Sequence, residues 1–320
     1  MEQSAVNTDR PPTISGGRGE LDNIQLMGDA DASGARLVGS TFAGRYRIVQ
    51  LLRGGGLTNV YLAEPLSLRP DPISDRPNPT HVLSGPITPR TAISRTGRTT
   101  RLALKVLRDR FREDRGVVRR FERGVAAAAD VVHPNVVRTG PLEHLPDGTP
   151  FCTMELLIGL DLADTLAQSR PLAQTRAVRI AEQAALGLSA AHGAGVIHLD
   201  VKPENIFLVH QDDGTELIKM LDFGLACIQG DATGARNGTP EYMAPEQRRA
   251  APAAPTMDVF ALGVVLHEML SGHSPTAPRW LAADIPFALS KIIHRATAPD
   301  PAERFPSIED FRRALIESGV

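Results

Sequence analysis

The chain has 320 residues and a formal net charge of −2 at pH 7. This length accommodates one two-lobed domain, and a nearly neutral chain without a basic or acidic block argues against nucleic acid or a membrane surface as the main partner. The two cysteines, Cys152 and Cys227, lack the spacing of a metal site or a disulfide framework, so we expect free thiols in a reducing compartment.

Residues 1–44 are rich in Gly, Ser, Asp and Pro and contain almost no aromatic side chains, which predicts a disordered tail. No apolar run follows the first residues. The longest apolar stretch, residues 259–270, is interrupted by His267 and Glu268 and is shorter than the about 20 residues that span a bilayer. We therefore expect a soluble, cytoplasmic protein.

Residues 45–155 are predicted to form a small, strand-rich lobe. The runs 46–52 and 59–63 are apolar and β-branched, and they flank a glycine turn that suits a hairpin. Residues 65–100 are dominated by Pro, Arg, Ser and Thr, which predicts a disordered insertion. A tolerated surface insert is favoured over a regulatory segment with phosphorylation sites, because long surface loops cost little stability.

Helical periodicity dominates residues 156–320, most clearly at 177–192 and 257–270. A strand-rich first part followed by a helix-rich second part predicts a bilobal α+β architecture.

Three chemically active side chains stand close together in residues 198–205: Asp200, Lys202 and Asn205. The segment is predicted to be a loop that enters a strand, and such a loop can present a carboxylate, an ammonium and an amide to one cleft. Two strands joined by a turn would place Asn205 beside Asp222. Amide and carboxylate oxygens are hard ligands that suit Mg²⁺.

This ordered set resembles the catalytic and metal-binding loops of eukaryotic-type serine/threonine protein kinases, including bacterial ones. The resemblance covers about residues 45–316 and implies a bilobal kinase fold with ATP and Mg²⁺ as cofactors. It implies that Asp200 accepts the proton of the substrate hydroxyl and that Lys202 stabilises the charge on the γ-phosphoryl group. Asn205 and Asp222 would hold Mg²⁺.

The resemblance also implies a nucleotide site in which Lys105 contacts the α- and β-phosphates. Glu246 would form an ion pair with Arg304, as the corresponding residues do in the family. The remaining expected positions of the nucleotide site are Gly54, Gly55 and Gly56 over the phosphates, Val60 and Ala103 above the adenine, Phe207 below it, Met154, Glu155 and Leu157 in the hinge, and Asp161 at the ribose.

The chain departs from the family's pattern at several positions. Arg53 and Thr58 stand where the Gly-rich loop has glycine, although an arginine could contact phosphate directly. Gly124 stands where the family's third helix carries the glutamate that pairs with the strand lysine. Glu122 lies about 200° around that helix and cannot simply replace it. Lys105 is therefore expected to be either held by Asp222 or poorly held.

A further departure is Leu199, which replaces an arginine that usually receives a phosphate on the activation loop, so switching by phosphorylation of that loop is disfavoured. The richness in Gly, Ala and Arg suggests a bacterial origin.

Two functions follow from this pattern. The first is an active serine/threonine protein kinase that transfers the γ-phosphoryl group of ATP to a protein hydroxyl. The alternative is a pseudokinase that acts as a nucleotide-binding scaffold or regulatory module, motivated by Gly124 and the altered glycine loop. A small-molecule kinase is disfavoured because residues 238–246 resemble a peptide-docking loop. In either case we expect the input to come from a regulatory protein that the sequence does not identify.

Overall fold

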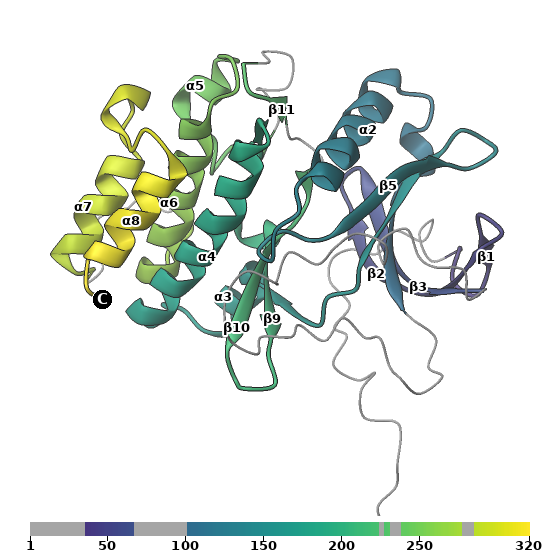
Figure 1. The fold of residues 1–320 in the computed structure, drawn as a ribbon, viewed down its shortest axis with the longest axis horizontal. Helices are drawn as coiled ribbons and strands as arrows, with labels where there is room; N and C mark the ends of the chain where they lie inside the picture. Colours follow the sequence, from purple (N-terminus) through teal and green to yellow (C-terminus); the bar gives the residue numbers. More distant parts are fainter. Residues whose placement is uncertain (1–35, 67–100, 224–226, 231–237, 277–284) are drawn as a thin grey trace, which may run out of the picture.

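The computed structural model describes residues 36–66, 101–223, 227–230, 238–276 and 285–320 (Figure 1). Within these ranges the smaller lobe is built on a six-stranded antiparallel sheet of order β1-β2-β3-β4-β6-β5. Its strands are β1 (Thr41–Phe42), β2 (Tyr46–Gly55), β3 (Thr58–Pro65), β4 (Leu102–Leu107), β5 (Thr139–His144) and β6 (Pro150–Glu155).

Strand β4 is buried at every position because both faces of the sheet are covered there. One face packs around Ile48 and Leu104, together with an edge-to-face pair of Phe42 and Phe151 whose ring centroids are 5.1 Å apart. The other face receives the apolar side of helix α2 (Arg115–Asp130). Helix α2 follows the short 3₁₀ turn η2 (Asp109–Phe111), and the carboxylate of Asp114 caps its first turn.

The predicted end of the N-terminal tail at residue 44 is wrong for residues 36–44. Strand β1 pairs with β2, and Phe42 is buried while Leu37 and Ala43 pack against the same core. Phe42 is buried because the pairing of β1 with β2 lets it pack on Phe151, and a local pattern does not reveal a contact between residues so far apart in the chain. Residues 1–35, and residues 67–100 that make up nearly all of the predicted insertion, lie outside the described residues.

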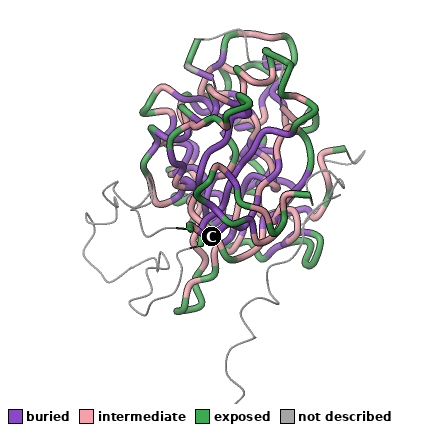
Figure 2. The backbone as a smooth tube through the Cα atoms, turned by 90° about the vertical axis from the view of Figure 1, so that its right-hand side faces the viewer, coloured by how far each residue is buried: buried purple, intermediate pink, exposed green. Residues whose placement is uncertain are grey.

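The larger lobe is helical, and its core lies among α4, α6, α7 and α8. Figure 2 shows that the buried segments gather in the interior of the protein. Helix α6 is buried along most of its length, so it forms the centre of this lobe. The helices are α3 (Leu162–Gln168), α4 (Gln174–Gly193), α5 (Pro245–Arg248), α6 (Pro255–Ser271), α7 (Phe287–Ala296) and α8 (Ile308–Glu317), with the 3₁₀ turn η5 (Pro301–Glu303) before α8.

Two small sheets lie where this lobe faces the smaller one. They contain β7 (Gly159–Asp161), β9 (Ile206–His210) and β10 (Glu216–Met220) in the order β10-β9-β7, and the antiparallel pair of β8 (Val196–Ile197) with β11 (Cys227–Ile228). The 3₁₀ turn η3 (Pro203–Asn205) leads directly into β9. The predicted bilobal α+β architecture is confirmed.

The expected pair of Glu246 and Arg304 is also confirmed. The guanidinium of Arg304 is fully buried and binds both carboxylate oxygens of Glu246, at 2.6 and 2.8 Å. It also donates to the backbone carbonyls of Thr256 and Ala298. A bidentate pair of this kind fixes α5 against α6 and the turn before α8.

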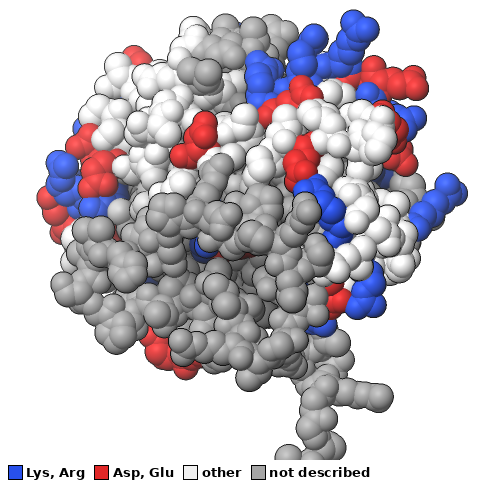
Figure 3. Space-filling view, turned by 45° about the vertical axis from the view of Figure 1, so that its right-hand side comes forward, with Lys and Arg blue, Asp and Glu red and all other residues white. Residues whose placement is uncertain are grey.

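Charged side chains of both signs lie interspersed on the face drawn in Figure 3. Exposed ion pairs of the smaller lobe include Arg112 with Asp147, at 3.0 Å, and Arg45 with Glu143. Each such pair contributes at most about 1 kcal/mol to stability, so these charges affect solubility more than the fold.

Candidate active site

The loop after β8 is held by a buried carboxylate on α6. The backbone N–H groups of His198 and Leu199 donate to the two oxygens of Asp258, each at 2.9 Å, and His192 Nε2 lies 2.8 Å from one of them. Leu199 has φ of +65°, a left-handed conformation that costs energy for a branched side chain. The two hydrogen bonds to Asp258 stabilise this turn and set the direction in which Asp200 leaves the loop.

Burial by itself would raise the pKa of Asp258. The hydrogen bonds from His192 and from the backbone of His198 outweigh that effect and hold the pKa of this carboxyl below its usual range. Asp258 therefore acts as a buried, ionised anchor. The sequence analysis assigned no role to Asp258, because its contact with the catalytic loop joins residues about 60 positions apart.

The predicted catalytic residues Asp200, Lys202 and Asn205 come together in the structure. Lys202 Nζ lies 3.0 Å from Asp200 Oδ2, and Asn205 Nδ2 donates to the backbone carbonyl of Asp200 at 2.9 Å and to its Oδ2 at 3.2 Å. The carboxylate of Asp200 is thus oriented by an ammonium and an amide from its own loop.

Thr239 completes this group, and the sequence analysis did not assign it a role. Its N–H and its hydroxyl both donate to Asp200 Oδ1 at 3.0 Å, while its Oγ1 accepts from Lys202 Nζ at 2.7 Å. Gly238 makes the approach possible, because a Cβ at that position would lie 2.8 Å from the Leu199 carbonyl oxygen, and its φ is +138°. The segment before α5 therefore contacts the catalytic loop directly.

Asn205 and Asp222 lie at the adjoining ends of β9 and β10. The N–H of Leu221 donates to the carbonyl of Asn205 at 2.8 Å, and His198 Nε2 donates to the carbonyl of Leu221, also at 2.8 Å. Asp222 follows with φ of +55°, a left-handed conformation that is rare for aspartate outside functional or turn positions. The expectation that strand pairing brings these two residues together is met by the backbone.

The residues present fit a magnesium ion. The amide nitrogen of Asn205 is turned to Asp200, which leaves the amide oxygen to face a cation beside the carboxylate of Asp222. Magnesium in phosphoryl-transfer sites takes one or two protein oxygens and completes its shell with water and phosphate oxygens. The described residues contain no cluster of three or more His, Cys, Asp or Glu side chains that could hold a metal.

Lys105 forms an ion pair with Asp222, so the first of the two expected arrangements is the observed one. Glu122 faces away and contacts His144 Nε2 at 2.8 Å. Gly124 is buried and lines, together with Lys105, a cavity of about 20 Å³, which is room for roughly one water molecule. The helix thus offers no carboxylate to the lysine at this position.

The expected adenine positions lie on the strands that meet at the junction of the lobes. Ala103 pairs with Met154 across β4 and β6, and Val60 pairs with Lys105 across β3 and β4. Phe207 pairs with Asp161 across β9 and β7. The strand register therefore places the expected adenine residues of both lobes at the ends of the lobes that face each other.

The hinge position Glu155 uses its side chain for structure. Its Oε1 accepts the N–H of Arg138 at 2.8 Å and pairs with the buried Lys219 at 2.7 Å. Only its main chain is left for an adenine, as the resemblance implies. Leu157 follows in the segment between β6 and β7 and is partly exposed.

The glycine turn forms as predicted, with Gly54 and Gly55 at the end of β2 and Gly56 in the turn that precedes β3. Gly56 has φ of +56°, which a side chain would adopt only with strain. Arg53 does not point to open solvent. Its Nη1 donates to the carbonyl of Glu204 at 3.0 Å and lies 3.7 Å from Asp161 Oδ2.

Leu199, which stands where the family's pattern has arginine, is buried in the larger lobe. Leu199 packs with Ile197, Cys227, Ala244 and Met257 and is almost inaccessible to solvent. A buried leucine offers no charge to a phosphate. Residues 224–226 and 231–237 of the segment that follows Asp222 lie outside the described residues.

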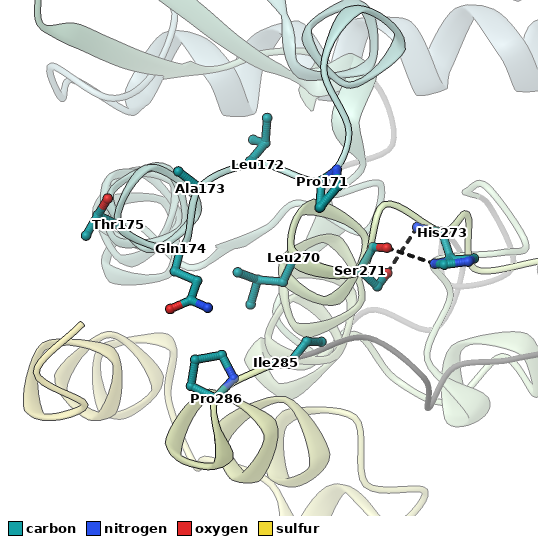
Figure 4. Close-up of a pocket in the computed structure, with 10 residues that line it drawn as sticks. All are labelled: Pro171, Leu172, Ala173, Gln174, Thr175, Leu270, Ser271, His273, Ile285 and Pro286. Carbon is teal, nitrogen blue, oxygen red and sulfur yellow. Dashed lines mark hydrogen bonds between the residues drawn. The ribbon is translucent and has the colours of Figure 1, made fainter.

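A larger cavity of about 620 Å³ lies away from these residues, between the starts of α4 and α7 and the end of α6 (Figure 4). Its side chains are mainly apolar or amide, and the ring of His273 is bound to the backbone of Ser271. The described residues that line it include no carboxylate or ammonium, so the chemically active groups of the protein lie at the other site.

A two-lobed fold with an aspartate, lysine and asparagine on one loop, and a lysine and aspartate joined across the lobes, defines a protein kinase domain. The family model of the protein kinase domain matches residues 91–317, and the chain belongs to this family. No helix among the described residues is long and apolar enough to cross a membrane.

The chain is similar to bacterial serine/threonine-protein kinases, as the resemblance predicted. It is 34% identical over 307 residues to serine/threonine-protein kinase pkn3 of Myxococcus xanthus, covering 87% of this chain and 50% of that protein. It is 31% identical to PrkC of Bacillus subtilis, covering 86% of this chain and 40% of that protein. The chain thus spans about half or less of the length of these relatives. Among solved structures, the kinase domain of Mycobacterium tuberculosis PknI is similar with 26% identity and a TM-score of 0.64, over 90% of this chain and all of that domain.

Proposed function

We propose that the chain is a serine/threonine protein kinase that transfers the γ-phosphoryl group of ATP to a hydroxyl of a protein substrate in the presence of Mg²⁺. The observation that carries this proposal is the contact of Asp200 with a hydroxyl group and an ammonium together. Asp200 Oδ1 accepts the hydroxyl of Thr239, and Lys202 lies against both Asp200 and Thr239.

In the proposed reaction the substrate oxygen forms a bond to the γ-phosphorus, and the bond from that phosphorus to the bridging oxygen of ADP breaks. Asp200 orients the substrate hydroxyl and takes its proton. Lys202 neutralises charge on the transferring group, and Lys105 does so for the remaining phosphates. Mg²⁺, when bound by Asn205 and Asp222, supplies further charge neutralisation between the phosphates.

The adenosine would lie between Val60 and Ala103 on one side and Phe207 on the other. The main chain of Glu155 and Leu157, next to Met154, would meet its edge, and Gly54, Gly55 and Gly56 would cover the phosphates. Support for this placement is the strand register on both sides of the junction between the lobes.

The state of the two cysteines supports a proposal about the compartment. Both are buried thiols, and burial raises the pKa of the Cys152 thiol to about 12, which makes it unreactive. We infer a reducing compartment, such as the cytoplasm, for the domain.

The test is phosphoryl transfer from labelled ATP, with Mg²⁺ and a generic basic protein substrate. Asp200→Asn keeps the shape of the side chain and removes the base, so label incorporation should fall by about 100-fold or more. Asp213→Asn, in the exposed turn between β9 and β10, is the matched control and should retain wild-type incorporation. Equal incorporation by the wild type and Asp200→Asn would refute the proposal. The described residues supply no observation that favours the pseudokinase alternative.

A further inference from the structure

Arg53 connects the two lobes at the mouth of the nucleotide site. It lies on β2, directly before the glycine turn and in the small lobe, at a position where the family's pattern has glycine. Its guanidinium contacts two groups of the large lobe, the carbonyl of Glu204 at 3.0 Å and Asp161 Oδ2 at 3.7 Å. One side chain therefore spans from the Gly-rich strand to the catalytic loop and to the expected ribose position.

The large lobe presents uncompensated negative charge to this arginine. Asp161 is buried, and one of its oxygens already accepts the N–H of Asp164 at the start of α3, at 2.9 Å. Among the described residues, Asp164 Oδ2 and Glu204 Oε2 are buried oxygens without a hydrogen-bond partner. A buried carboxylate oxygen without a hydrogen-bond partner is costly, so a cation at this place is favoured.

The charges around Asp161 affect its pKa in the way that this arrangement implies. Burial raises the pKa of Asp161, the nearby charges of Asp164 and Glu204 add to the increase, and Arg53 opposes it. The neighbouring cations are engaged elsewhere, since Lys202 contacts Asp200 and Arg170 lies 3.6 Å from Glu268. Arg53 is the cation that reaches Asp161.

We propose that Arg53 is an inter-lobe latch that occupies the ribose position on Asp161, and that a nucleotide binds by displacing it. Because one oxygen of Asp161 belongs to the α3 cap, only the other is available, and a guanidinium and a ribose hydroxyl compete for it. The latch closes the empty domain and weakens nucleotide binding. The identity of the competing ligand rests on the proposed function, whereas the latch itself rests only on the contacts of Arg53.

The latch is tested first without nucleotide, by hydrogen exchange of backbone amides in the full chain. Arg53→Gln retains a side chain of similar reach without the charge. Peptides covering residues 50–60 and 199–206 should exchange several-fold faster in this variant than in the wild type. Arg47→Gln, on the same strand and paired with Glu64 outside the cleft, is the matched control and should leave these peptides unchanged. Unchanged exchange in Arg53→Gln would overturn the latch.

Competition with the nucleotide is tested by titration with ADP and Mg²⁺, which avoids turnover. Arg53→Gln and Arg53→Gly should bind ADP about 3- to 10-fold more tightly than the wild type, a gain of about 0.7–1.4 kcal/mol. In an Asp161→Asn background, which keeps a capping side chain, the same changes at Arg53 should have little effect. Equal or weaker binding of ADP by Arg53→Gln would overturn the proposed competition. Equal binding would mean that Arg53 has no effect on ADP affinity, and weaker binding would mean that Arg53 contacts the phosphates of ADP.

The two experiments separate the two proposals. If no variant binds ADP, the nucleotide-dependent function and the competition both fail, while hydrogen exchange still decides whether Arg53 ties the lobes together. If ADP binds but exchange and affinity are unchanged in Arg53→Gln, the latch fails and the proposed function is unaffected.

Discussion

Lys105 on β4 of the small lobe is bound to Asp222, which follows β10 of the large lobe. Because Gly124 provides no carboxylate, this aspartate holds the lysine, and under the proposed function it would also provide an oxygen for a metal ion. In the empty domain the two side chains neutralise each other. When a metal and phosphates bind, the phosphates can take over the role of Asp222 toward Lys105. The pair therefore connects lysine placement, metal binding and the relative position of the lobes.

Lys105→Met should reduce phosphoryl transfer by about 100-fold or more while leaving the free energy of unfolding nearly unchanged. The partner Asp222 is 44% exposed in its side chain and remains hydrated after the change. Lys219→Met is the matched comparison, because it leaves the largely buried carboxylate of Glu155 without its cationic partner and should cost about 3–5 kcal/mol of stability. Activity assays and urea unfolding of both variants measure the contrast. A large loss of stability in Lys105→Met would contradict this account of the pair.

Gly124→Glu should increase kcat/KM several-fold. A carboxylate at this position would face Lys105 and release Asp222 for the metal ion. Helix α2 would move outward slightly, because the cavity of about 20 Å³ is smaller than a glutamate side chain. Gly124→Ala is the control, since it improves helix propensity by about 1 kcal/mol without adding charge. Steady-state kinetics give kcat/KM for both variants. An equal increase in Gly124→Ala and Gly124→Glu would show that the added charge is not the cause.

Thr239→Val should lower kcat by about 10- to 100-fold. The change removes the hydroxyl that donates to Asp200 and accepts from Lys202, and hydrogen bonds to charged groups contribute about 1.5–3 kcal/mol each. Thr239→Ser keeps the hydroxyl and should retain most of the activity. Single-turnover measurements with saturating ATP compare the three proteins, and a valine variant with wild-type kcat would show that Thr239 does not orient Asp200.

Asp258→Asn should destabilise the domain most at neutral pH. The folded-state pKa of Asp258 lies below its usual range, so its ionised form stabilises the fold above the unfolded pKa of about 3.9, and this contribution is lost as the pH falls through the folded pKa. The difference in unfolding free energy between the wild type and the variant should therefore narrow below about pH 4. Urea unfolding between pH 3 and pH 7 measures it, and a difference independent of pH would contradict an ionised anchor.

Much of the fold and site could be predicted from local patterns. The segment 198–205 determines that Asp200, Lys202 and Asn205 share one loop, because they are only a few residues apart. The same holds for the glycine turn and for the helices with clear periodicity. Strand β1 was missed because it is only two residues long and Phe42 is buried by packing on Phe151, which is far from it in the sequence.

The contacts that decide how the site works come from residues far apart in the chain. The sequence left two arrangements open for Lys105, either held by Asp222 or poorly held. The structure shows that it is bound to Asp222, which is 117 residues away. Thr239 meets Asp200 across 39 residues, and Arg53 meets Glu204 across 151. The sequence by itself determined which chemical groups are present and which of them share a loop. The tertiary structure decided which charge pairs with which, because Coulomb and hydrogen-bond energies depend on distances of a few ångströms that only the packing of the two lobes sets.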